Sequence, residues 1–446
     1  MAEMVRDQAL TAQQAADLVG RVAAAADQAA ALPAHQRAAV LTRISEGIEK
    51  RAETFARLIT QEVGKPIKDA RREAARAAFT FRWAAAEALR LGGEVLPLDL
   101  EPGTEGRLAL TKRFPRGPAL LISPFNFPLN LAAHKIAPAI AVGAPFVHKP
   151  ASSARRTAAE LGRLVVESGW PADAMAVVNI SGAEALALVQ DERFGVLSFT
   201  GSSAVGWRLK SLAGRKQVLL ELGGNAGVFV AEDADLDLAA ARCAWGAFCY
   251  AGQVCISVQR IYAASRIYEA FRDKLLKKIG ELKVGDPQDE KTDVGPLIST
   301  EDAKRVEAWI QEALAAGGRL LCGGVRQGDI VTPALIEDAP PHCKVICEEV
   351  FGPVATLAAV DSAETALRCM AEGRYGLQAG IFTRDIGTIL RFWERLSVGG
   401  IIVNDAPTFR SDVMPYGGTK DSGIGREGLR YAMEEFTELR TLVLRA

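Results

Sequence analysis

Five short apolar runs between residues 119 and 221 set the expected architecture, beginning with Ala119-Leu120-Leu121-Ile122-Ser123 and Pro145-Phe146-Val147-His148-Lys149. Three further runs of this kind occupy residues 176–180, 195–199 and 217–221. Helical patterns separate the runs, and buried strands that alternate with helices predict a parallel sheet covered on both faces. Because ligands of such sheets bind beyond the carboxyl ends of the strands, we expect functional residues directly after these runs.

The regions around these runs extend the same α/β pattern. Residues 11–90 carry apolar side chains at helical spacing and are expected to be helical. Residues 107–113 have the pattern of an exposed strand, and a second α/β section runs from about residue 228 to residue 396. The C-terminal run 439–444 has the pattern of a lone strand without a partner nearby in the sequence, so we expect it to pair with another subunit. The predicted fold class is α/β.

Length and composition restrict the class of protein. At 446 residues the chain exceeds the size of one hydrophobic core, which predicts two or more domains. The 53 Lys and Arg residues are balanced by 54 Asp and Glu residues, so there is no basic surplus for nucleic acid. No apolar run is long enough to span a bilayer, and Met1–Asp7 lacks the order of a secretory signal. We expect neither nucleic acid nor a membrane as a partner.

The cysteines and histidines favour a cytoplasmic enzyme without a metal. The seven cysteines are odd in number and irregularly spaced, which indicates reduced thiols rather than disulfides. With only four histidines and no Cys-x-x-Cys pair, a structural zinc site has few ligands, and no metal site is predicted.

Six separated segments of the chain carry recognisable motifs. They are Pro124-Phe125-Asn126-Phe127-Pro128, Phe199-Thr200-Gly201-Ser202 through Gly206, Glu221-Leu222-Gly223-Gly224-Asn225, Gly252-Gln253-Val254-Cys255, Glu349-Val350-Phe351-Gly352-Pro353, and Pro415-Tyr416-Gly417-Gly418 through Gly425-Arg426-Glu427. In this order and approximate spacing, from about residue 35 onward, the chain resembles the aldehyde dehydrogenase superfamily. The segment Asn404–Arg410 is similar to the branch of lactaldehyde and non-phosphorylating glyceraldehyde 3-phosphate dehydrogenases.

The resemblance implies a domain organisation and an assembly. It implies a Rossmann-type cofactor-binding domain at 1–96 and 116–223, an α/β catalytic domain at 224–421, and a small β oligomerisation arm at 97–115 and 437–446. A homodimer or homotetramer is expected, with contacts around Leu98 to Arg113 and the C-terminal strand. Family members begin with strands ahead of the first long helix, whereas this chain begins almost at that helix. Either the start is truncated or the cofactor domain lacks that hairpin.

The resemblance implies that Cys255 is the nucleophile, which forms a thiohemiacetal and then a thioester. A thiolate suits this chemistry because it is strongly nucleophilic. Most free cysteines are small buried hydrophobes, and the Gly-Gln-Val-Cys setting distinguishes this one. Asn126, held between Pro124 and Pro128, is implied to stabilise the oxyanion together with the backbone N–H of Cys255, although an Asn in an ordinary turn has the same local sequence.

Three further residues complete the implied catalytic set. Glu221 ends a buried apolar run, which predicts a raised pKa and suits a general base that activates water for thioester hydrolysis. Glu427 matches a family glutamate that relays protons, and Lys135 matches a lysine near the nucleophile. A capping or salt-bridging role is the alternative for each of them.

NADP or NAD is the implied cofactor. The residues implied to contact it are Ile122, Ser123, Pro124, Phe125, Lys149, Ser152, Gly201, Ser202, Val205, Leu222, Gly223, Glu349 and Phe351. NAD-preferring relatives usually carry a glutamate at the position of Ser152. A serine does not repel a 2′-phosphate, and Arg155 or Arg156 can pair with it, so NADP is slightly favoured. Alternatively, these residues merely begin the following helix.

A short, anionic aldehyde is the expected substrate. The family topology places its contacts at Phe127, Leu131, His134, Val254, Ile256, Arg410 and Arg76, with Arg72 one turn before Arg76. Arginine and histidine favour a substrate with a carboxylate or phosphate, although surface arginines are common.

Two other functions stay open at this stage. One is a dehydrogenase that releases an acyl-CoA, but such relatives commonly lack the glutamate found at Glu221. The other is a non-catalytic structural or binding protein, which would be expected to lose Cys255, Glu221 or Asn126.

Overall fold

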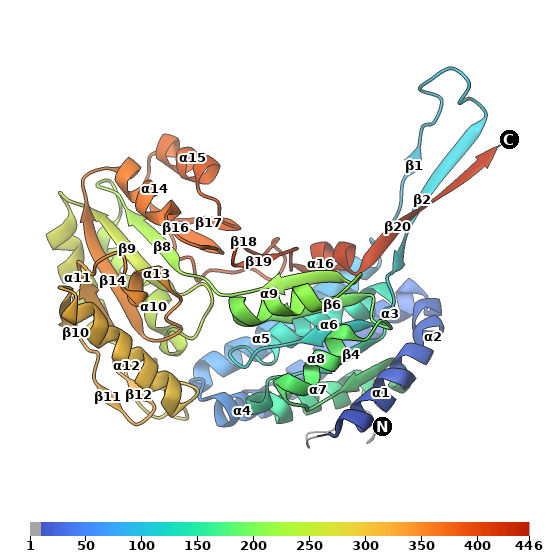
Figure 1. Cartoon of the computed structure of the whole chain (residues 1–446), viewed down its shortest axis with the longest axis horizontal. Coiled ribbons are helices and arrows are strands. Elements are labelled where there is room, and N and C mark those ends of the chain that lie inside the picture. The colour runs from blue at the N-terminus through green and yellow to red at the C-terminus, as the bar shows by residue number, and fades with distance from the viewer. Residues whose placement is uncertain (1–9, 446) are drawn as a thin grey trace.

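The structure is a computed structural model that describes residues 10–445, so the prediction for Met1–Asp7 lies outside the described residues. The chain forms two α/β bodies side by side and a β arm that projects from one of them (Figure 1). The predicted α/β class is confirmed.

A six-stranded sheet forms the centre of the first body. Its strands are β3 (Ala119–Ile122), β4 (Phe146–Lys149), β5 (Met175–Val177), β6 (Val196–Thr200), β7 (Gln217–Glu221) and β19 (Gly423–Ile424). Their order is β19-β7-β6-β3-β4-β5, and the strands run parallel except for β19 at one edge. The five strands predicted between residues 119 and 221, and their parallel arrangement, are therefore confirmed.

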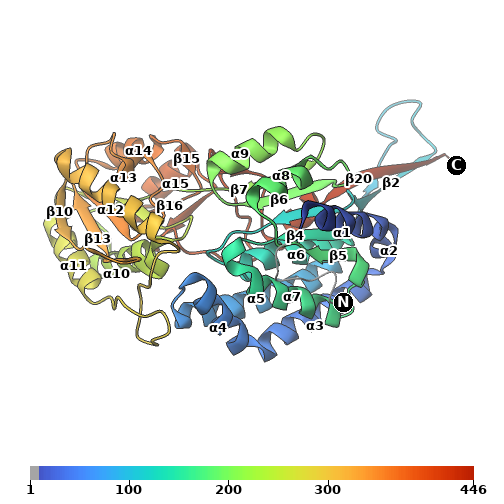
Figure 2. The same ribbon diagram turned by 60° about the horizontal axis from the view of Figure 1, so that its bottom comes forward.

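Helices cover both faces of this sheet. They are α1 (Ala12–Ala24), α2 (Ala26–Ala31), α3 (Ala34–Lys50), α4 (Ala52–Val63), α5 (Ile67–Ala88), α6 (Asn130–Val142), α7 (Arg155–Glu167), α8 (Gly182–Gln190), α9 (Ser203–Leu212) and α16 (Leu429–Glu435), with the 3₁₀ turns η1 (Ser152–Ala154) and η2 (Ala172–Ala174). Alternate side chains of a strand point to opposite faces. Ala119 and Leu121 accordingly belong to a cluster with α3, α5, α6 and α7, whereas Leu120 and Ile122 belong to another with α1 and α8. Figure 2 shows these two sets of helices on either side of the sheet.

The break between α4 and α5 brings a charged residue into the interior. α4 ends at Gly64, whose φ of 66° is left-handed, and α5 begins directly after Pro66. Glycine and proline at these positions are typical of a helix break, and Lys65 between them is almost fully buried.

A seven-stranded sheet forms the second body. Its strands are β8 (Ala226–Val230), β9 (Val258–Ala264), β10 (Arg319–Cys322), β13 (Ala334–Glu337), β14 (Val354–Val360), β16 (Gln378–Phe382) and β17 (Gly400–Val403). The order is β10-β13-β14-β9-β8-β16-β17, with β10 antiparallel at one edge. Its helices are α10 (Leu236–Phe248), α11 (Tyr268–Gly280), α12 (Thr300–Ala315), α13 (Lys344–Cys347), α14 (Ala363–Ala371) and α15 (Ile386–Arg395), and η3 (Cys249–Gly252) follows α10. Two small ladders pair β11 (Arg326–Gln327) with β12 (Ile330–Val331) and β15 (Tyr375–Gly376) with β18 (Thr419–Lys420).

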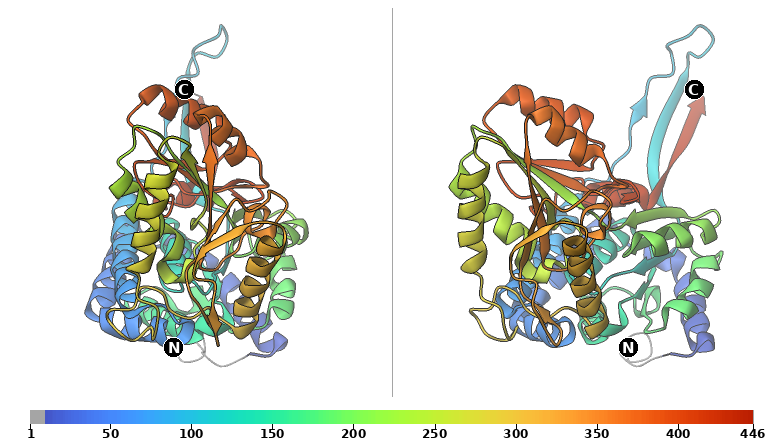
Figure 3. Two further views of the ribbon diagram at one scale, coloured as in Figure 1. Left: turned by 90° about the vertical axis from the view of Figure 1, so that its left-hand side faces the viewer. Right: turned by 60° about the vertical axis from the view of Figure 1, so that its left-hand side comes forward.

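The arm is a three-stranded antiparallel sheet of β1 (Val95–Leu96), β2 (Arg107–Pro115) and β20 (Thr437–Arg445). Figure 3 shows it projecting from the body. β20 pairs along its whole length with β2 of its own chain and forms one edge of this sheet, so its predicted pairing with another subunit stays a prediction. The pairing with β2 arises because α16 turns the end of the chain back alongside a strand that is distant in the sequence.

The predicted domain boundaries stay a prediction. The six-stranded sheet takes its strands from residues 119–221 and 423–424, the seven-stranded sheet from 226–403, and the arm from 95–115 and 437–445. Within residues 10–445, no helix is both long and apolar enough to cross a membrane, and no group of three His, Cys, Asp or Glu side chains could hold a metal ion. The cytoplasmic location also stays a prediction.

Candidate active site

Cys255 follows a turn with strained backbone. Tyr250, Ala251 and Gly252 in η3 have φ values of 50°, 53° and 69°, all in the left-handed region. A Cβ on Gly252 would lie 2.1 Å from the carbonyl oxygen of Gly352, so only glycine fits there. Left-handed non-glycine residues each cost about 1–3 kcal/mol and concentrate at functional sites. The turn therefore holds two of the predicted motifs together, one with Cys255 and one with Gly352.

The sulfur of Cys255 is part-buried and contacts a tyrosine. Its Sγ lies 3.1 Å from the hydroxyl oxygen of Tyr416. Burial raises the pKa of Cys255 to about 12, and the Tyr416 hydrogen bond opposes that rise. Without ligands the sulfur is therefore a thiol, and nucleophilic attack requires that its proton be lost.

Asn126 is anchored close to the nucleophile. Its side-chain amide nitrogen donates to the carbonyl oxygen of Gln253 at 2.9 Å, and its amide oxygen accepts from the backbone N–H of Phe127 at 3.1 Å. An amide group has two N–H donors, so one remains for a ligand. The arrangement fits the predicted oxyanion donor, whose role stays a prediction.

Glu221 ends β7 with one carboxyl oxygen free for a ligand. The side chain is buried, and its Oε2 has no hydrogen-bond partner among the described residues. Burial raises its pKa well above the ordinary value, and repulsion from Glu427 adds to the rise. The predicted raised pKa is confirmed in direction.

Glu427, in contrast, is held as a carboxylate. Its two oxygens accept from Lys135 Nζ at 3.1 Å and from Arg410 Nη2 at 2.9 Å. Burial opposes ionisation, but the charges of Lys135 and Arg410 lower the pKa of Glu427 below its ordinary value. Lys135 also donates to the hydroxyl of Ser198 at 3.0 Å. The two neighbouring carboxyl groups therefore differ in protonation, as acid–base catalysis needs.

A cavity of about 260 Å³ lies between the two bodies beside this cluster. Its lining residues are Lys65, Asp69, Arg72, Glu73, Arg76, Phe127, Arg242, Trp245, Cys249, Tyr250, Val254, Thr408, Phe409 and Arg410. The structure thus brings four of the seven predicted substrate residues, Phe127, Val254, Arg410 and Arg76, into one cavity. The side chain of Arg410 is nearly buried, and its guanidinium carbon lies 3.7 Å from the centre of the Tyr416 ring.

The other three predicted substrate residues lie behind the cavity wall. Leu131 and Ile256 are buried and are not part of the lining. The buried ring of His134 bonds through Nε2 to Asp412 at 2.8 Å. Arg76 bonds to the same carboxylate at 2.7 Å and 3.1 Å, so His134 supports a cavity residue rather than facing the cavity. The reason is that α6 turns His134 inward, which the helical pattern alone did not reveal.

Sequence reasoning did not select Lys65 or Tyr416 as site residues. Lys65 is paired with Glu73, and its Nζ lies 3.5 Å from the centre of the Phe127 ring. Glu73 also accepts from the backbone N–H groups of Leu129 and Asn130 at the start of α6. The Gly64-Lys65-Pro66 break and the Pro415-Tyr416 motif mark these positions, but the contacts are long-range.

Glu349 and Phe351 lie where the two bodies meet. Glu349 accepts from the backbone N–H of Gly224 at 2.9 Å, and a Cβ on Gly223 would lie 2.3 Å from its Oε2. Burial raises the pKa of Glu349 to about 7. The ring of Phe351 meets that of Phe125 edge to face, with centroids 5.9 Å apart. The Glu349 carboxylate thus packs directly against the backbone of Gly223 and Gly224, and the contact of Glu349 and Phe351 with a nicotinamide ribose stays a prediction.

The strand ends supply the adenine side of the predicted cofactor site. Ser123 follows β3, and its hydroxyl lies 2.7 Å from Nε2 of His148 in β4. Lys149 ends β4, and burial lowers its pKa. Ser202 occupies the N-cap position of α9 without a side-chain capping hydrogen bond. The backbone N–H groups at such a helix start can receive a phosphate. Within the same set, Ile122 and Leu222 are buried whereas Val205 is exposed.

Ser152 begins η1 and is exposed, and Arg155 and Arg156 next to it are also exposed. The Arg156 guanidinium lies 3.5 Å from the amide oxygen of Gln61, so it turns toward α4. No carboxylate occupies position 152 itself, but the Glu62 carboxylate accepts from the backbone N–H groups of Arg156 and Thr157 at 2.7 Å and 2.9 Å.

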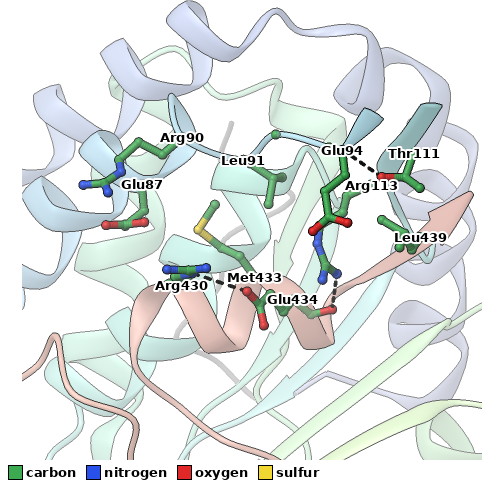
Figure 4. Close-up of a pocket in the computed structure, with 12 residues that line it drawn as sticks. Glu87, Arg90, Leu91, Glu94, Thr111, Arg113, Arg430, Met433, Glu434 and Leu439 are labelled. Carbon is green, nitrogen blue, oxygen red and sulfur yellow. Dashed lines mark hydrogen bonds and ion pairs between the residues drawn. The ribbon is translucent and has the colours of Figure 1, made fainter. Parts of the chain in front are cut away.

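A larger hollow of about 360 Å³ lies elsewhere, between the end of α5, the arm and α16. Figure 4 shows Arg430 paired with Glu434, and Arg113 bonded to the carbonyl oxygen of Glu434. None of the predicted substrate residues lines this hollow, whereas four of them line the smaller cavity. Val254, next to Cys255, and Arg410, which is paired with Glu427, also belong to that smaller lining. We therefore place the substrate side of the active site in the smaller cavity.

Comparisons with known proteins identify the family of the chain. The model of the aldehyde dehydrogenase family matches residues 2–442. A 3-sulfolactaldehyde dehydrogenase of Priestia megaterium is 41% identical over 411 residues, which cover 92% of this chain and 86% of the relative. The crystal structure of aldehyde dehydrogenase 21 from Physcomitrella patens, in complex with the reaction product succinate, has a TM-score of 0.96 at 43% identity, over 98% of this chain and 91% of that chain. A glyceraldehyde-3-phosphate dehydrogenase from Methanocaldococcus jannaschii, complexed with NADP, has a TM-score of 0.95 at 38% identity, over 98% and 96%. The chain belongs to the aldehyde dehydrogenase family.

Proposed function

We propose that the protein oxidises a short aldehyde with a second, anionic group and releases the carboxylic acid. The observation that carries this proposal is the position of Arg410, which lines the cavity and stacks on Tyr416, while Tyr416 contacts the sulfur of Cys255. A guanidinium this close to the nucleophile can hold the far end of a short substrate. The Nε of Arg410 has no hydrogen-bond partner among the described residues, so a donor remains for an anionic oxygen.

The similar proteins also support an anionic substrate. The other cations of the cavity lining do not add to this support, because each is already paired with a carboxylate: Lys65 with Glu73, Arg72 with Asp69, Arg76 with Asp412 and Arg242 with Asp405. The similar proteins described above act on a sulfonated aldehyde, yield succinate, or are named for a phosphorylated aldehyde. Each of these molecules has an anionic group a few atoms from its reacting carbon.

We propose NAD(P) as the cofactor, with NADP favoured. Glu349 and Phe351 would hold the nicotinamide ribose, and Lys149 and Ser152 would face the adenine ribose. When bound, the cofactor supplies a hydride acceptor. The Methanocaldococcus jannaschii relative was solved in complex with NADP, which supports NADP for this chain. The residue of this chain that favours NADP in the proposal is Ser152, where a glutamate would repel the 2′-phosphate.

In the acylation half of the proposed reaction, the sulfur of Cys255 forms a bond to the aldehyde carbon. The remaining amide N–H of Asn126 donates to the oxygen that becomes negative, together with the backbone N–H of Cys255. Because burial favours the neutral thiol, its proton passes to a water molecule before the sulfur attacks. Loss of hydride from the adduct then leaves a thioester on Cys255.

In the deacylation half, Glu221 acts as the general base. Its unbonded Oε2 accepts a proton from water as the water oxygen bonds to the thioester carbon. The carbon–sulfur bond then breaks, its electron pair stays on the sulfur, and the acid is released. Release to coenzyme A is the alternative, and the presence of Glu221 at the end of β7 favours water. Product analysis with and without coenzyme A separates the two.

Kinetics with paired aldehydes tests the substrate class. NAD(P)H formation is measured with glyceraldehyde 3-phosphate and succinic semialdehyde, and with the uncharged glyceraldehyde and butanal. We expect kcat/KM to favour the anionic aldehydes by about tenfold or more, the effect of one charge-assisted hydrogen bond. Arg410→Gln should remove that preference, and Arg384→Gln at an exposed position is the control. Equal turnover of charged and neutral aldehydes by the unaltered enzyme would refute the anionic substrate.

A further inference from the structure

Tyr416 is the side chain that the proposed mechanism has not yet used, although it touches the nucleophile. It is 2% exposed, and its hydroxyl oxygen lies 3.1 Å from Sγ of Cys255. Its backbone is fixed by two hydrogen bonds with Glu427, of 3.0 Å and 2.7 Å. The hydroxyl is therefore held against the sulfur from a separate segment of the chain.

The direction of this hydrogen bond depends on the state of the sulfur. When Cys255 is a thiol, either atom can donate. A thiolate has no proton and can only accept, so the bond then runs from the Tyr416 hydroxyl to the sulfur. Hydrogen bonds to a charged acceptor are stronger than those between neutral groups, so the contact favours the thiolate.

Arg410 makes the Tyr416 hydroxyl a better donor. Its guanidinium carbon lies 3.7 Å from the centre of the Tyr416 ring, and the guanidinium is oriented by its ion pair with Glu427. A cation over the face of a phenol stabilises the negative charge that builds up as the hydroxyl donates. The same guanidinium also attracts the thiolate directly.

We propose that Tyr416 is a catalytic residue whose hydroxyl donates to the Cys255 thiolate, before it attacks the aldehyde and again when it leaves the thioester. This inference rests on the proposed function, in which Cys255 is the nucleophile. In the leaving step, the water proton passes to Glu221 and the carbon–sulfur bond breaks. The electron pair of that bond stays on the sulfur, and the Tyr416 hydroxyl donates a hydrogen bond to the resulting thiolate. No proton leaves Tyr416, so the hydroxyl is unchanged at the end of the cycle.

The charged groups around the sulfur explain why such a donor is needed. Burial is the largest effect against the thiolate, and the carboxyl groups of Glu349 and Glu221 act in the same direction. Tyr416 and Arg410 act in the opposite direction. If the Tyr416 hydroxyl is removed, the charge of Arg410 is the one of these two effects that still favours the Cys255 thiolate.

The experiment measures the pH dependence of Cys255 alkylation by iodoacetamide in the cofactor-free enzyme, followed on the Cys255 peptide by mass spectrometry. Tyr416→Phe removes the hydroxyl and keeps the ring under Arg410. We expect the midpoint of the rate profile to rise by about one pH unit or more, so that alkylation below it slows about tenfold. Tyr268→Phe is the matched control, because Tyr268 in α11 also loses a buried hydroxyl bond, to Glu337.

The outcomes separate this inference from the proposed function. An unchanged midpoint in Tyr416→Phe would overturn the role of Tyr416, because a merely structural residue does not move the profile of the thiol. If Cys255→Ser still oxidised aldehydes, the proposed function would fail whatever the alkylation profile. If Tyr416→Phe does not fold, two other variants give the same comparison. Tyr416→His keeps a ring with a hydrogen-bond donor, whereas Tyr416→Leu has no donor. The His variant should have the lower midpoint, and equal midpoints would refute the proposal.

Discussion

Ser152 is the residue on which the proposed cofactor preference depends. It is exposed at the start of η1, where a carboxylate would repel a 2′-phosphate. Ser152→Glu should lower kcat/KM for NADP by about tenfold, through loss of a hydrogen bond and repulsion, and leave NAD turnover nearly unchanged. Steady-state kinetics with both cofactors checks this, with Ser153→Glu at the neighbouring exposed position as the control. An unaltered NADP preference would remove Ser152 from the cofactor site.

Glu221 determines the expected pH dependence of thioester hydrolysis. Its pKa is raised by burial and by Glu427, and only the ionised form can accept a proton from water. Hydrolysis should therefore speed up as the pH rises through this raised pKa and slow down below it. In Glu221→Gln the initial burst of NAD(P)H should persist while the steady-state rate falls by about a hundredfold. Rapid-mixing kinetics at several pH values checks both statements, and a steady rate equal to that of the unaltered enzyme would contradict the assignment of the base.

At the level of elements, the turn η3 positions the nucleophile through its last residue. Gly252→Ala would place a Cβ 2.1 Å from the carbonyl oxygen of Gly352 at a left-handed φ. We expect a loss of stability of about 1–3 kcal/mol and a loss of most activity, since the chain must shift next to Cys255. Gly214→Ala is the matched control, because Gly214 has a φ of 61° with open space around its Cβ position. Thermal unfolding and initial rates of both variants give the comparison, and equal losses would show that backbone strain alone is responsible.

The order and type of these elements could be predicted because short-range pattern determines them. Strands such as β3 and β6 are buried on both faces and appear as continuous apolar runs, and Gly64 with Pro66 ends one helix and starts the next. The resemblance placed β2 and β20 in one arm, but their residue-by-residue register could not be predicted, because an antiparallel pair distant in the sequence leaves no local signal. The inward direction of His134 was missed for a related reason: every residue of α6 is buried, so periodicity does not distinguish the faces of this helix.

At the scale of the whole molecule, the arm is a candidate assembly surface. Leu439, Leu442, Val443 and Leu444 in β20 are 54%, 54%, 51% and 47% exposed. A small isolated sheet with apolar side chains on both faces is marginal in water, so we expect a second copy to cover it in a homodimer or homotetramer. Leu442→Lys combined with Leu444→Lys should reduce the particle to a monomer in light scattering. Val325→Lys, at a site 58% exposed, is the control, and an unchanged particle size in the double variant would exclude the arm.

The sequence by itself determined the family, the α/β class, the five parallel strands of the first sheet and the identity of the candidate nucleophile, base and oxyanion donor. The strands follow from the local periodicity of apolar residues, and the family and the candidate residues follow from short motifs that the sequence carries in a characteristic order. Only the tertiary structure decided that Tyr416 touches Cys255, that Lys65 is buried against Phe127, and that the pKa of Glu221 is raised while that of Glu427 is lowered. The physical reason is that contacts, burial and charge environment arise between segments far apart in the chain, and they exist only once the two bodies are folded against each other.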